Sequence, residues 1–164
     1  MVASPKVKSL DQLVKIRLAL RRQGKKVVFT NGCFDVLHRG HVYCLKEAKS
    51  LGDVLMVGLN SDASVRKLKG EKRPILPQSD RAEILAALEM VDYVLIFKED
   101  TPHRVISALV PDVLVKGGDY GKNEIVGSDV VKSGGGRVVR VKTFPGRSTR
   151  DIVKRIASRY RRGG

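Results

Sequence analysis

Residues 26–52 read KVVFTNGCFDVLHRGHVYCLKEAKSLG, and this stretch decides the fold. Residues 26–30 are mostly apolar, as in a short buried strand. From His41 to Leu51 the apolar residues recur at helical spacing, and Gly52 then ends the helix. A glycine-containing turn with two histidines joins the two segments. The stretch therefore predicts a strand, a turn and a helix.

The same alternation continues toward the C-terminus. Further strands are predicted at residues 54–59, 93–97, 113–115 and 137–141, and helices at about residues 80–90, after Pro102, near residues 123–132 and from Ser148. Apolar strands separated by helices are typical of a parallel sheet covered on both faces. We therefore expect an α/β fold, a single Rossmann-like doubly wound domain with a five-stranded parallel sheet and helices on both faces. Ligands of such sheets bind outside the carboxyl ends of the strands.

The N-terminal segment is predicted to form a helix of its own. Ser9 and Gln12 have the spacing of a capping box, and the helix then runs to about Arg22 and stops at Gly24. Because it precedes the first strand, we interpret this helix as an appendage to the core. The predicted division is residues 1–24 as an N-terminal helical extension and residues 25–164 as the main domain, with a basic C-terminal tail.

The composition limits the possible functions. The formal charge of the 164 residues is +15, and residues 1–30 hold eight Lys and Arg against one Asp, while residues 151–164 hold five against one. Because the excess lies at the ends and the chain has no Trp for stacking, nucleic-acid binding is not the expected main function. A basic nucleic-acid-binding module stays open as an alternative.

The cellular setting is also predicted from composition. Cys33 and Cys44 do not have the spacing of a disulfide framework or a zinc site. No apolar run approaches the roughly 20 residues of a membrane helix. We therefore expect a cytoplasmic protein that does not enter a membrane.

The turn after the first strand ends in His38-Arg39-Gly40-His41, where the next helix begins. Unpaired N–H groups and the positive end of the dipole favour a phosphate at a helix N-terminus. Gly40 allows its close approach, and the imidazoles of His38 and His41 can donate to its oxygens. Two histidines can also bind zinc, but no third ligand is placed by the spacing. A GxGxxG motif and a Walker loop are both absent, so the stretch predicts a different kind of nucleotide phosphate site.

Three further segments that follow predicted strands carry cations or hydroxyls. Residues 66–74 are densely cationic and are interpreted as a mobile loop that brings lysines over a triphosphate. Residues 116–120, KGGDY, combine two glycines with a lysine and an aspartate, and residues 146–150, GRSTR, open the last helix. The hydroxyls and N–H groups of that helix start can bind phosphates. We expect these segments to meet at one crevice.

The motifs resemble the nucleotidyltransferase superfamily with the GxFDxxHxGH signature. TNGCFDVLHRGH, NSDASVRKLKGEKRPI, LEMVDYV, EDTPHRVI, PDVLVKGGDY and GRST are together similar to its ADP-heptose-forming adenylyltransferase branch, over about residues 25–156. The resemblance implies in-line attack by D-glycero-β-D-manno-heptose 1-phosphate on the α-phosphorus of ATP, with Mg²⁺ and pyrophosphate leaving together. The product would be ADP-heptose for the lipopolysaccharide core. Glycerol-3-phosphate cytidylyltransferase, or another sugar or polyol-phosphate nucleotidyltransferase, is the alternative enzyme.

The resemblance also implies a role for individual residues. The catalytic residues are His38, His41 and a lysine, either Lys67 or Lys69, between which the sequence does not choose. The residues implied to bind ATP are Asn31, Gly32, Cys33, Phe34, Gly40, Arg81, Gly117, Gly118, Ser148 and Thr149. Those implied to bind the acceptor are Asp35, Lys116 and Asp119, and no side chain is implied to ligate a metal.

In two respects the chain departs from the pattern of its relatives. The family element [I/C]STT reads RSTR here, so that Arg150 replaces a hydroxyl contact by a charge. In many relatives the domain follows a sugar kinase, so we expect a separate heptose kinase to supply the sugar 1-phosphate. The resemblance further implies a homo-oligomer.

Overall fold

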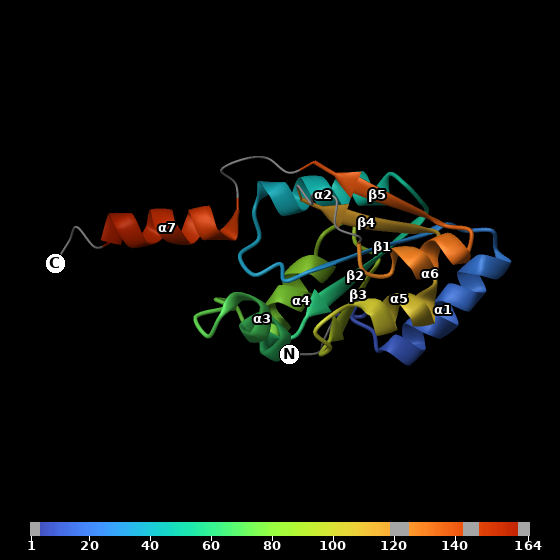
Figure 1. The fold of residues 1–164 in the computed structure, drawn as a ribbon, viewed down its shortest axis with the longest axis horizontal. Coiled ribbons are helices and arrows are strands. Elements are labelled where there is room, and N and C mark those ends of the chain that lie inside the picture. Colours follow the sequence, from blue (N-terminus) through green and yellow to red (C-terminus); the bar gives the residue numbers. More distant parts are fainter. Residues whose placement is uncertain (1–3, 119–124, 143–147, 161–164) are drawn as a thin grey trace.

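The computed structural model describes residues 4–118, 125–142 and 148–160. Within these residues, five parallel strands form one sheet in the order β3-β2-β1-β4-β5, with helices on both faces (Figure 1). The strands are β1 (Val27–Gly32), β2 (Val54–Asn60), β3 (Tyr93–Phe97), β4 (Val113–Gly117) and β5 (Arg137–Val141). The helices are α1 (Leu10–Arg22), α2 (Arg39–Lys49), α3 (Asp62–Lys69), α4 (Gln78–Ala86), α5 (His103–Leu109), α6 (Ser128–Ser133) and α7 (Thr149–Tyr160). The predicted α/β class and five-stranded parallel sheet are confirmed.

The order of the strands determines where a ligand can bind. β1 pairs with β2 on one side, Val27 beside Val54, and with β4 on the other, Val28 beside Val113. The chain runs outward from β1 through β2 to β3, then returns to the other side for β4 and β5. The order in which strands are added to the sheet therefore reverses between β1 and β4. Open sheets of this kind bind ligands at that point, outside the carboxyl ends of the strands.

Both faces of the sheet are covered by apolar side chains. Along β1 the side chains alternate, so that Val28 joins a buried cluster with Leu45 of α2, while Phe29 joins a second cluster on the opposite face. That second cluster contains Leu13 of α1 and Ile106 of α5, and all five of these side chains are fully buried. The central strand is thus fixed between two layers of helices.

Helix α1 is part of the second layer. Leu13 is fully buried, and the guanidinium of Arg17 donates to the Val110 carbonyl oxygen at 3.0 Å and pairs with Asp112 at 3.0 Å. Ahead of the helix, the backbone of Val7 forms a parallel bridge to the edge strand β3. The described residues of this segment therefore pack against one face of the core, and the division into residues 1–24 and 25–164 stays a prediction.

The cationic stretch 66–74 is not one loop. Its first half lies in α3, a helix that the sequence analysis did not predict, and Gly70 ends that helix with φ of 94°. The hydroxyl of Ser61 caps the helix by accepting the Ser64 N–H. The helix has only a short apolar face, and the many lysines and arginines around it leave too few apolar residues to show a helical periodicity. The interpretation as a loop therefore applies only to the residues after Gly70, which join α3 to α4.

Helix α7 extends away from the sheet at the end of the chain (Figure 1). None of its residues is buried, and its first turn meets the domain where the Thr149 hydroxyl donates to the Val36 carbonyl oxygen at 3.4 Å. Its apolar residues are too few for a membrane span, and none of the other described helices is long and apolar enough either.

Candidate active site

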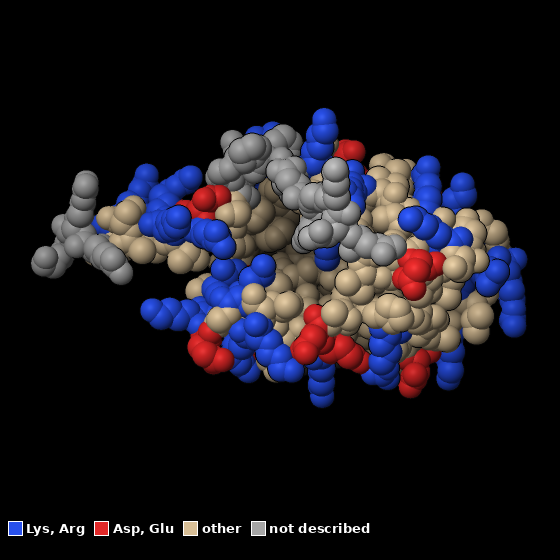
Figure 2. Space-filling view, viewed as in Figure 1, with Lys and Arg blue, Asp and Glu red and all other residues tan. Residues whose placement is uncertain are grey.

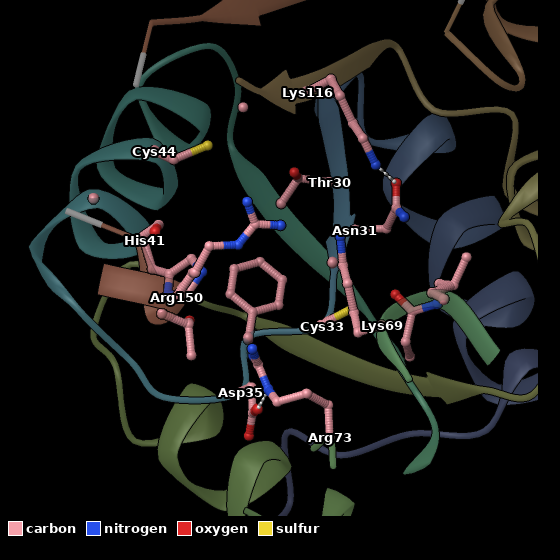
Figure 3. A pocket seen from close by; sticks show the side chains of 18 of the residues that line it. Thr30, Asn31, Cys33, Asp35, His41, Cys44, Lys69, Arg73, Lys116 and Arg150 are labelled. Carbon is pink, nitrogen blue, oxygen red and sulfur yellow. Dashed lines mark hydrogen bonds and ion pairs between the residues drawn. The ribbon is translucent and has the colours of Figure 1, made fainter. Parts of the chain in front are cut away.

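A cavity of about 940 Å³ opens at the carboxyl ends of β1 and β4 (Figure 3). Figure 2 shows lysine and arginine side chains around the hollow on this face. The site residues expected from the sequence that line it are Asn31, Gly32, Cys33, Phe34, Asp35, His38, Gly40, His41, Lys69, Lys116, Gly117, Ser148 and Thr149. Residues far apart in the sequence thus surround one space, because each follows a strand or begins a helix at the same edge of the sheet.

Three of the expected site residues that the structure describes are not among those that line the cavity. Lys67 pairs instead with Asp100 at 3.0 Å, with both side chains well exposed. Arg81 is buried behind the cavity wall, and the Gly118 N–H donates to the Val141 carbonyl oxygen. Asp119 lies outside the described residues. Of the two candidate lysines, Lys69 is therefore the one that faces the cavity.

His38 is the N-cap of α2. Its Nδ1 accepts the Gly40 N–H at 3.1 Å, so in the neutral ring the proton is on Nε2. Its ring stacks on that of His41, with 3.8 Å between centroids and 22° between planes. The capping bond and the stacking hold Nε2 as a hydrogen-bond donor at the start of the helix.

His41 is more deeply enclosed than His38. Its ring packs against Phe34, with 5.1 Å between centroids. Its Nδ1 is buried, and no described residue forms a hydrogen bond with it. Burial is the main cause that lowers the pKa of His41 from 6.5 to about 4, and His38 lowers it further, while Asp35 acts in the opposite direction. Burial also lowers the pKa of His38. Both rings are thus neutral donors at pH 7, and positive charge in the cavity comes from lysine and arginine.

The turn between β1 and α2 is held in an uncommon backbone conformation. Phe34 has φ of 42°, in the left-handed region that bulky residues rarely adopt. A Cβ at Gly32 would lie 3.1 Å from the Phe34 ring, a tight contact that the ring could relieve only by shifting. Strained residues of this kind cluster at binding sites where the surrounding structure enforces them. Here the conformation places Phe34 against His41.

Asp35 is bonded within the protein. Its fully buried carboxylate accepts hydrogen bonds from the Arg73 guanidinium, from the Ile75 N–H at 2.7 Å and from the Leu76 N–H at 2.9 Å. Burial alone would raise the pKa of Asp35, but these backbone and arginine donors lower it below 3.8. The carboxylate of Asp35 therefore anchors the loop after α3, while Asp35 also lines the cavity, and its contact with the acceptor stays a prediction.

Arg81 joins three segments behind the cavity. Its guanidinium donates to the carbonyl oxygens of Cys33 at 2.5 Å and Asn60 at 2.9 Å, and pairs with Asp62 at 2.7 Å. Its Nε donates to the Leu76 carbonyl oxygen at 3.0 Å. With no exposed side-chain surface, Arg81 cannot touch a nucleotide in this arrangement. It ties the ends of β1 and β2 to the loop that Asp35 also holds.

Lys116 connects the ends of β4 and β1. Its ammonium donates to the Asn31 side-chain oxygen at 3.2 Å (Figure 3). Burial lowers its pKa from 10.5, with a smaller lowering by Lys69 and opposing contributions from Cys33 and Cys44. A partly desolvated ammonium interacts more strongly with an anion than one in bulk water. Lys116 and Lys69 are thus two cations on separate elements that face one cavity.

Several lining residues were not expected from the sequence. Cys44, Asp151 and Lys154 line the cavity but lie outside the quoted motifs, and Arg73 lines it from within a motif without having been given a role. Arg73 lies in the cationic stretch, yet composition alone does not separate its role from those of its neighbours. Among the described residues, no group of three or more His, Cys, Asp or Glu side chains is arranged to hold a metal ion.

Known proteins resemble this chain over most of its length. Residues 29–153 match the family model described as cytidylyltransferase-like. The bifunctional protein HldE of Geobacter metallireducens is 60% identical over 155 residues, which is 94% of this chain and 32% of that protein. HldE of Geobacter sulfurreducens is 58% identical over 155 residues, again 94% of this chain and 32% of that protein. The chain spans about a third of the length of these curated relatives.

Two solved structures share the fold. The lipopolysaccharide core biosynthesis protein from Thermoplasma volcanium has a TM-score of 0.61 and 30% identity, covering 74% of this chain and 98% of that one. The pantoate-beta-alanine ligase from Francisella tularensis, solved with beta-gamma ATP and beta-alanine, has a TM-score of 0.58 at 16% identity. It covers 84% of this chain and 67% of the ligase, and the likeness concerns the fold alone.

Proposed function

Because the chain belongs to the cytidylyltransferase-like family, we propose that it transfers AMP from ATP to D-glycero-β-D-manno-heptose 1-phosphate. The products are ADP-heptose, for the lipopolysaccharide core, and pyrophosphate. The observation that carries the proposal is the stacked His38–His41 pair at the start of α2, inside a cavity between the ends of β1 and β4. The Thermoplasma relative is a lipopolysaccharide core biosynthesis protein, which supports the choice of acceptor.

The reaction requires no nucleophile from the protein. A phosphate oxygen of the sugar 1-phosphate attacks the α-phosphorus of ATP and forms the new P–O bond. The bond from the α-phosphorus to the bridging oxygen of the β-phosphate breaks, and pyrophosphate leaves with those electrons. Cys33 faces the cavity, but burial raises the pKa of its thiol above 9.0, so it stays protonated and is not a nucleophile.

The cavity supplies donors and charge to this reaction. The neutral imidazoles of His38 and His41 donate hydrogen bonds to non-bridging phosphate oxygens, while Lys69 and Lys116 balance the negative charge. Such preorganised groups stabilise charge that develops in the transition state. Mg²⁺ would be held chiefly by the triphosphate oxygens, as is common for this ion. When bound, it would neutralise part of the charge on the leaving pyrophosphate.

Asp35 and Arg81 act as positioning residues in this proposal. Both bond to the backbone of the loop that follows α3, which begins directly after Lys69. Arg81 also bonds to the backbone carbonyl of Cys33, which lies in the turn before the histidines. Because these bonds fix the loop to the turn, Lys69 and the histidine pair line the same cavity. Asn31, Gly32, Phe34, Gly40, Gly117, Ser148 and Thr149 form the remaining nucleotide site.

The decisive experiment measures pyrophosphate release over a matrix of four nucleoside triphosphates and several phosphorylated sugars and polyols. The rate of pyrophosphate release with ATP and D-glycero-β-D-manno-heptose 1-phosphate is expected to exceed the rate with every other pair. Highest activity with CTP and glycerol 3-phosphate would replace the proposal by a cytidylyltransferase. Release with no pair, combined with tight salt-dependent RNA binding, would favour a nucleic-acid-binding module instead.

The two lysines of α3 provide a matched pair of variants. Lys69→Ala is expected to lower kcat with ATP and the heptose phosphate by tenfold or more, because its ammonium faces the cavity. Lys67→Ala removes the same charge from the same helix but only breaks an exposed pair with Asp100. Its kcat should stay within about twofold of the parent. Equal losses in the two variants would contradict the assignment to Lys69.

The wider setting follows from the same proposal. The chain acts in the cytoplasm, where ATP is available, and uses an acceptor that a sugar kinase activity must first phosphorylate at the anomeric position. It assembles as a homo-oligomer. Light scattering coupled to size-exclusion chromatography tests the assembly, and a single-copy mass at micromolar concentration would contradict it.

A further inference from the structure

Arg150 is a cavity cation at a position where the family pattern has a hydroxyl residue. It lies in the first turn of α7 and lines the cavity. Figure 3 shows its side chain extending across the cavity, with the guanidinium directed toward the strand ends. Among the described residues, no hydrogen bond or salt bridge involves this guanidinium. Hydrogen bonds from Ser148 lower the pKa of Asp151 and the charge of Arg150 lowers it further, but no such bond or bridge from a described residue holds the guanidinium in place.

The other arginine of the cavity differs in this respect. Arg73 is also part of the lining, but its guanidinium is paired with the buried carboxylate of Asp35. Its charge is thus already neutralised within the protein. An arginine without such a partner keeps its planar set of donors for a ligand, and this geometry suits two phosphate oxygens at once.

The position of Arg150 indicates which part of a nucleotide it would meet. The Thr149 hydroxyl donates to the Val36 carbonyl oxygen, which sets the start of α7 beside the turn that leads to His38. Lys116 lies at the opposite wall, at the end of β4 (Figure 3). With the histidine pair at the reacting α-phosphate, the turn of Ser148, Thr149 and Arg150 would face the phosphates that leave.

The charges of the site favour the same conclusion. Both histidines are neutral at pH 7, since burial lowers the pKa of each. A triphosphate therefore needs lysines and arginines to balance it, and Lys69, Lys116 and Arg150 come from three different elements around the cavity. We propose that Arg150 binds the β- and γ-phosphates of the nucleotide and stabilises pyrophosphate as it departs. This inference rests on the proposed nucleotidyl transfer.

The test compares ligands that differ only in their phosphates. Calorimetry gives the Kd of ATP, AMP and inorganic pyrophosphate for the parent protein, for Arg150→Ala and for Arg150→Lys, at one salt concentration. Arg150→Ala should raise the Kd of ATP and of pyrophosphate by tenfold or more and change the Kd of AMP by less than about twofold. Arg150→Lys should recover part of the loss, because a point charge remains without the planar donors.

Arg155→Ala is the matched control, since it removes the same charge from an exposed position of α7 that does not line the cavity. It should leave all three affinities unchanged. Equal weakening of ATP and AMP by Arg150→Ala, or unchanged pyrophosphate binding, would overturn the inference. If the parent shows this binding pattern but forms no ADP-heptose, the role of Arg150 stands and only the proposed acceptor fails.

Discussion

The two histidines of the HxGH motif are equivalent in sequence but not in the structure. His38 uses Nδ1 to cap α2, whereas the Nδ1 of His41 is buried and no described residue bonds to it. Burial lowers the pKa of both rings, and the stacked His38 lowers that of His41 further. The pair therefore contributes directed N–H donors, and the cations of the cavity contribute charge.

Removing either imidazole is expected to damage catalysis more than folding. By analogy with the loss of one oxyanion-hole donor, His38→Ala and His41→Ala should each lower kcat by about a hundred- to thousandfold, or about 2.7 to 4 kcal/mol. Steady-state kinetics with ATP and the heptose phosphate measures the loss, and circular dichroism verifies the fold. Losses below tenfold in both variants would remove the histidines from the chemistry.

The buried ring of His41 also predicts a pH dependence of stability. Its pKa of about 4 in the folded chain lies below its ordinary value of 6.5, so between these values the unfolded chain binds more protons. The free energy of unfolding should therefore fall as the pH drops from 6.5 toward 4, by at most about 1.4 kcal/mol per pH unit from this group.

Urea unfolding of the parent and of His41→Gln across this pH range isolates the effect. The variant keeps the carboxylates but lacks the titrating ring, so its stability should depend less on pH. Identical slopes in the two proteins would show that His41 is not buried in its neutral form.

At the level of elements, α1 and α7 show opposite relations to the domain. Both are amphipathic helices near the ends of the chain, yet α1 buries Leu13 and Arg17 while α7 buries no residue. The difference arises because α1 covers the sheet face on which Phe29 and Ile106 also lie. Helix α7 contributes the residues of its first turn to the cavity.

The integration of α1 predicts a large effect of one substitution. Leu13→Ala should lower the free energy of unfolding by about 2 to 5 kcal/mol, as is typical when a fully buried leucine is truncated. Leu18→Ala, on the same helix but 52% exposed, serves as the control and should change it by less than about 0.5 kcal/mol. Chemical denaturation measures both. A small effect of Leu13→Ala would restore the view of α1 as an appendage.

At the level of the whole molecule, the reversal of strand order concentrates cations at one place. Lys69 follows β2 along the chain, Lys116 ends β4 and Arg150 begins α7, yet all three line the same cavity. Electrostatic attraction of this kind acts on the phosphates of a ligand and is screened by salt. The fold thus predicts that phosphate number governs affinity.

Thermal unfolding can measure this preference. ATP at a hundredfold excess over its Kd should stabilise the folded chain by about 2.7 kcal/mol, which raises Tm by several degrees. AMP at the same concentration should raise Tm less, because it lacks the two phosphates that we propose Arg150 binds. Addition of salt to about 0.5 M should reduce the difference by screening. Equal shifts with ATP and AMP would contradict a site organised around the triphosphate.

Sequence by itself determined the alternation of strands and helices, the α/β class and the segments that could carry chemistry. It did so because burial of alternate faces imposes a local periodicity, and because a helix start with paired histidines is a local pattern. The prediction missed α3, where basic residues outnumber the apolar ones. The helix α1 and its capping box were predicted correctly, but its packing was not, because that depends on α5 far along the chain.

Only the tertiary structure decided which charged side chains face the cavity. In the structure Lys69 faces the cavity and Lys67 does not, and Arg81 is buried behind the cavity wall. The Asp35 carboxylate is bonded to the loop after α3. A long side chain takes its direction from partners that are distant in sequence, such as Asp100 for Lys67 and Ile75 for Asp35. Those partners come together only when the strands are ordered in the sheet.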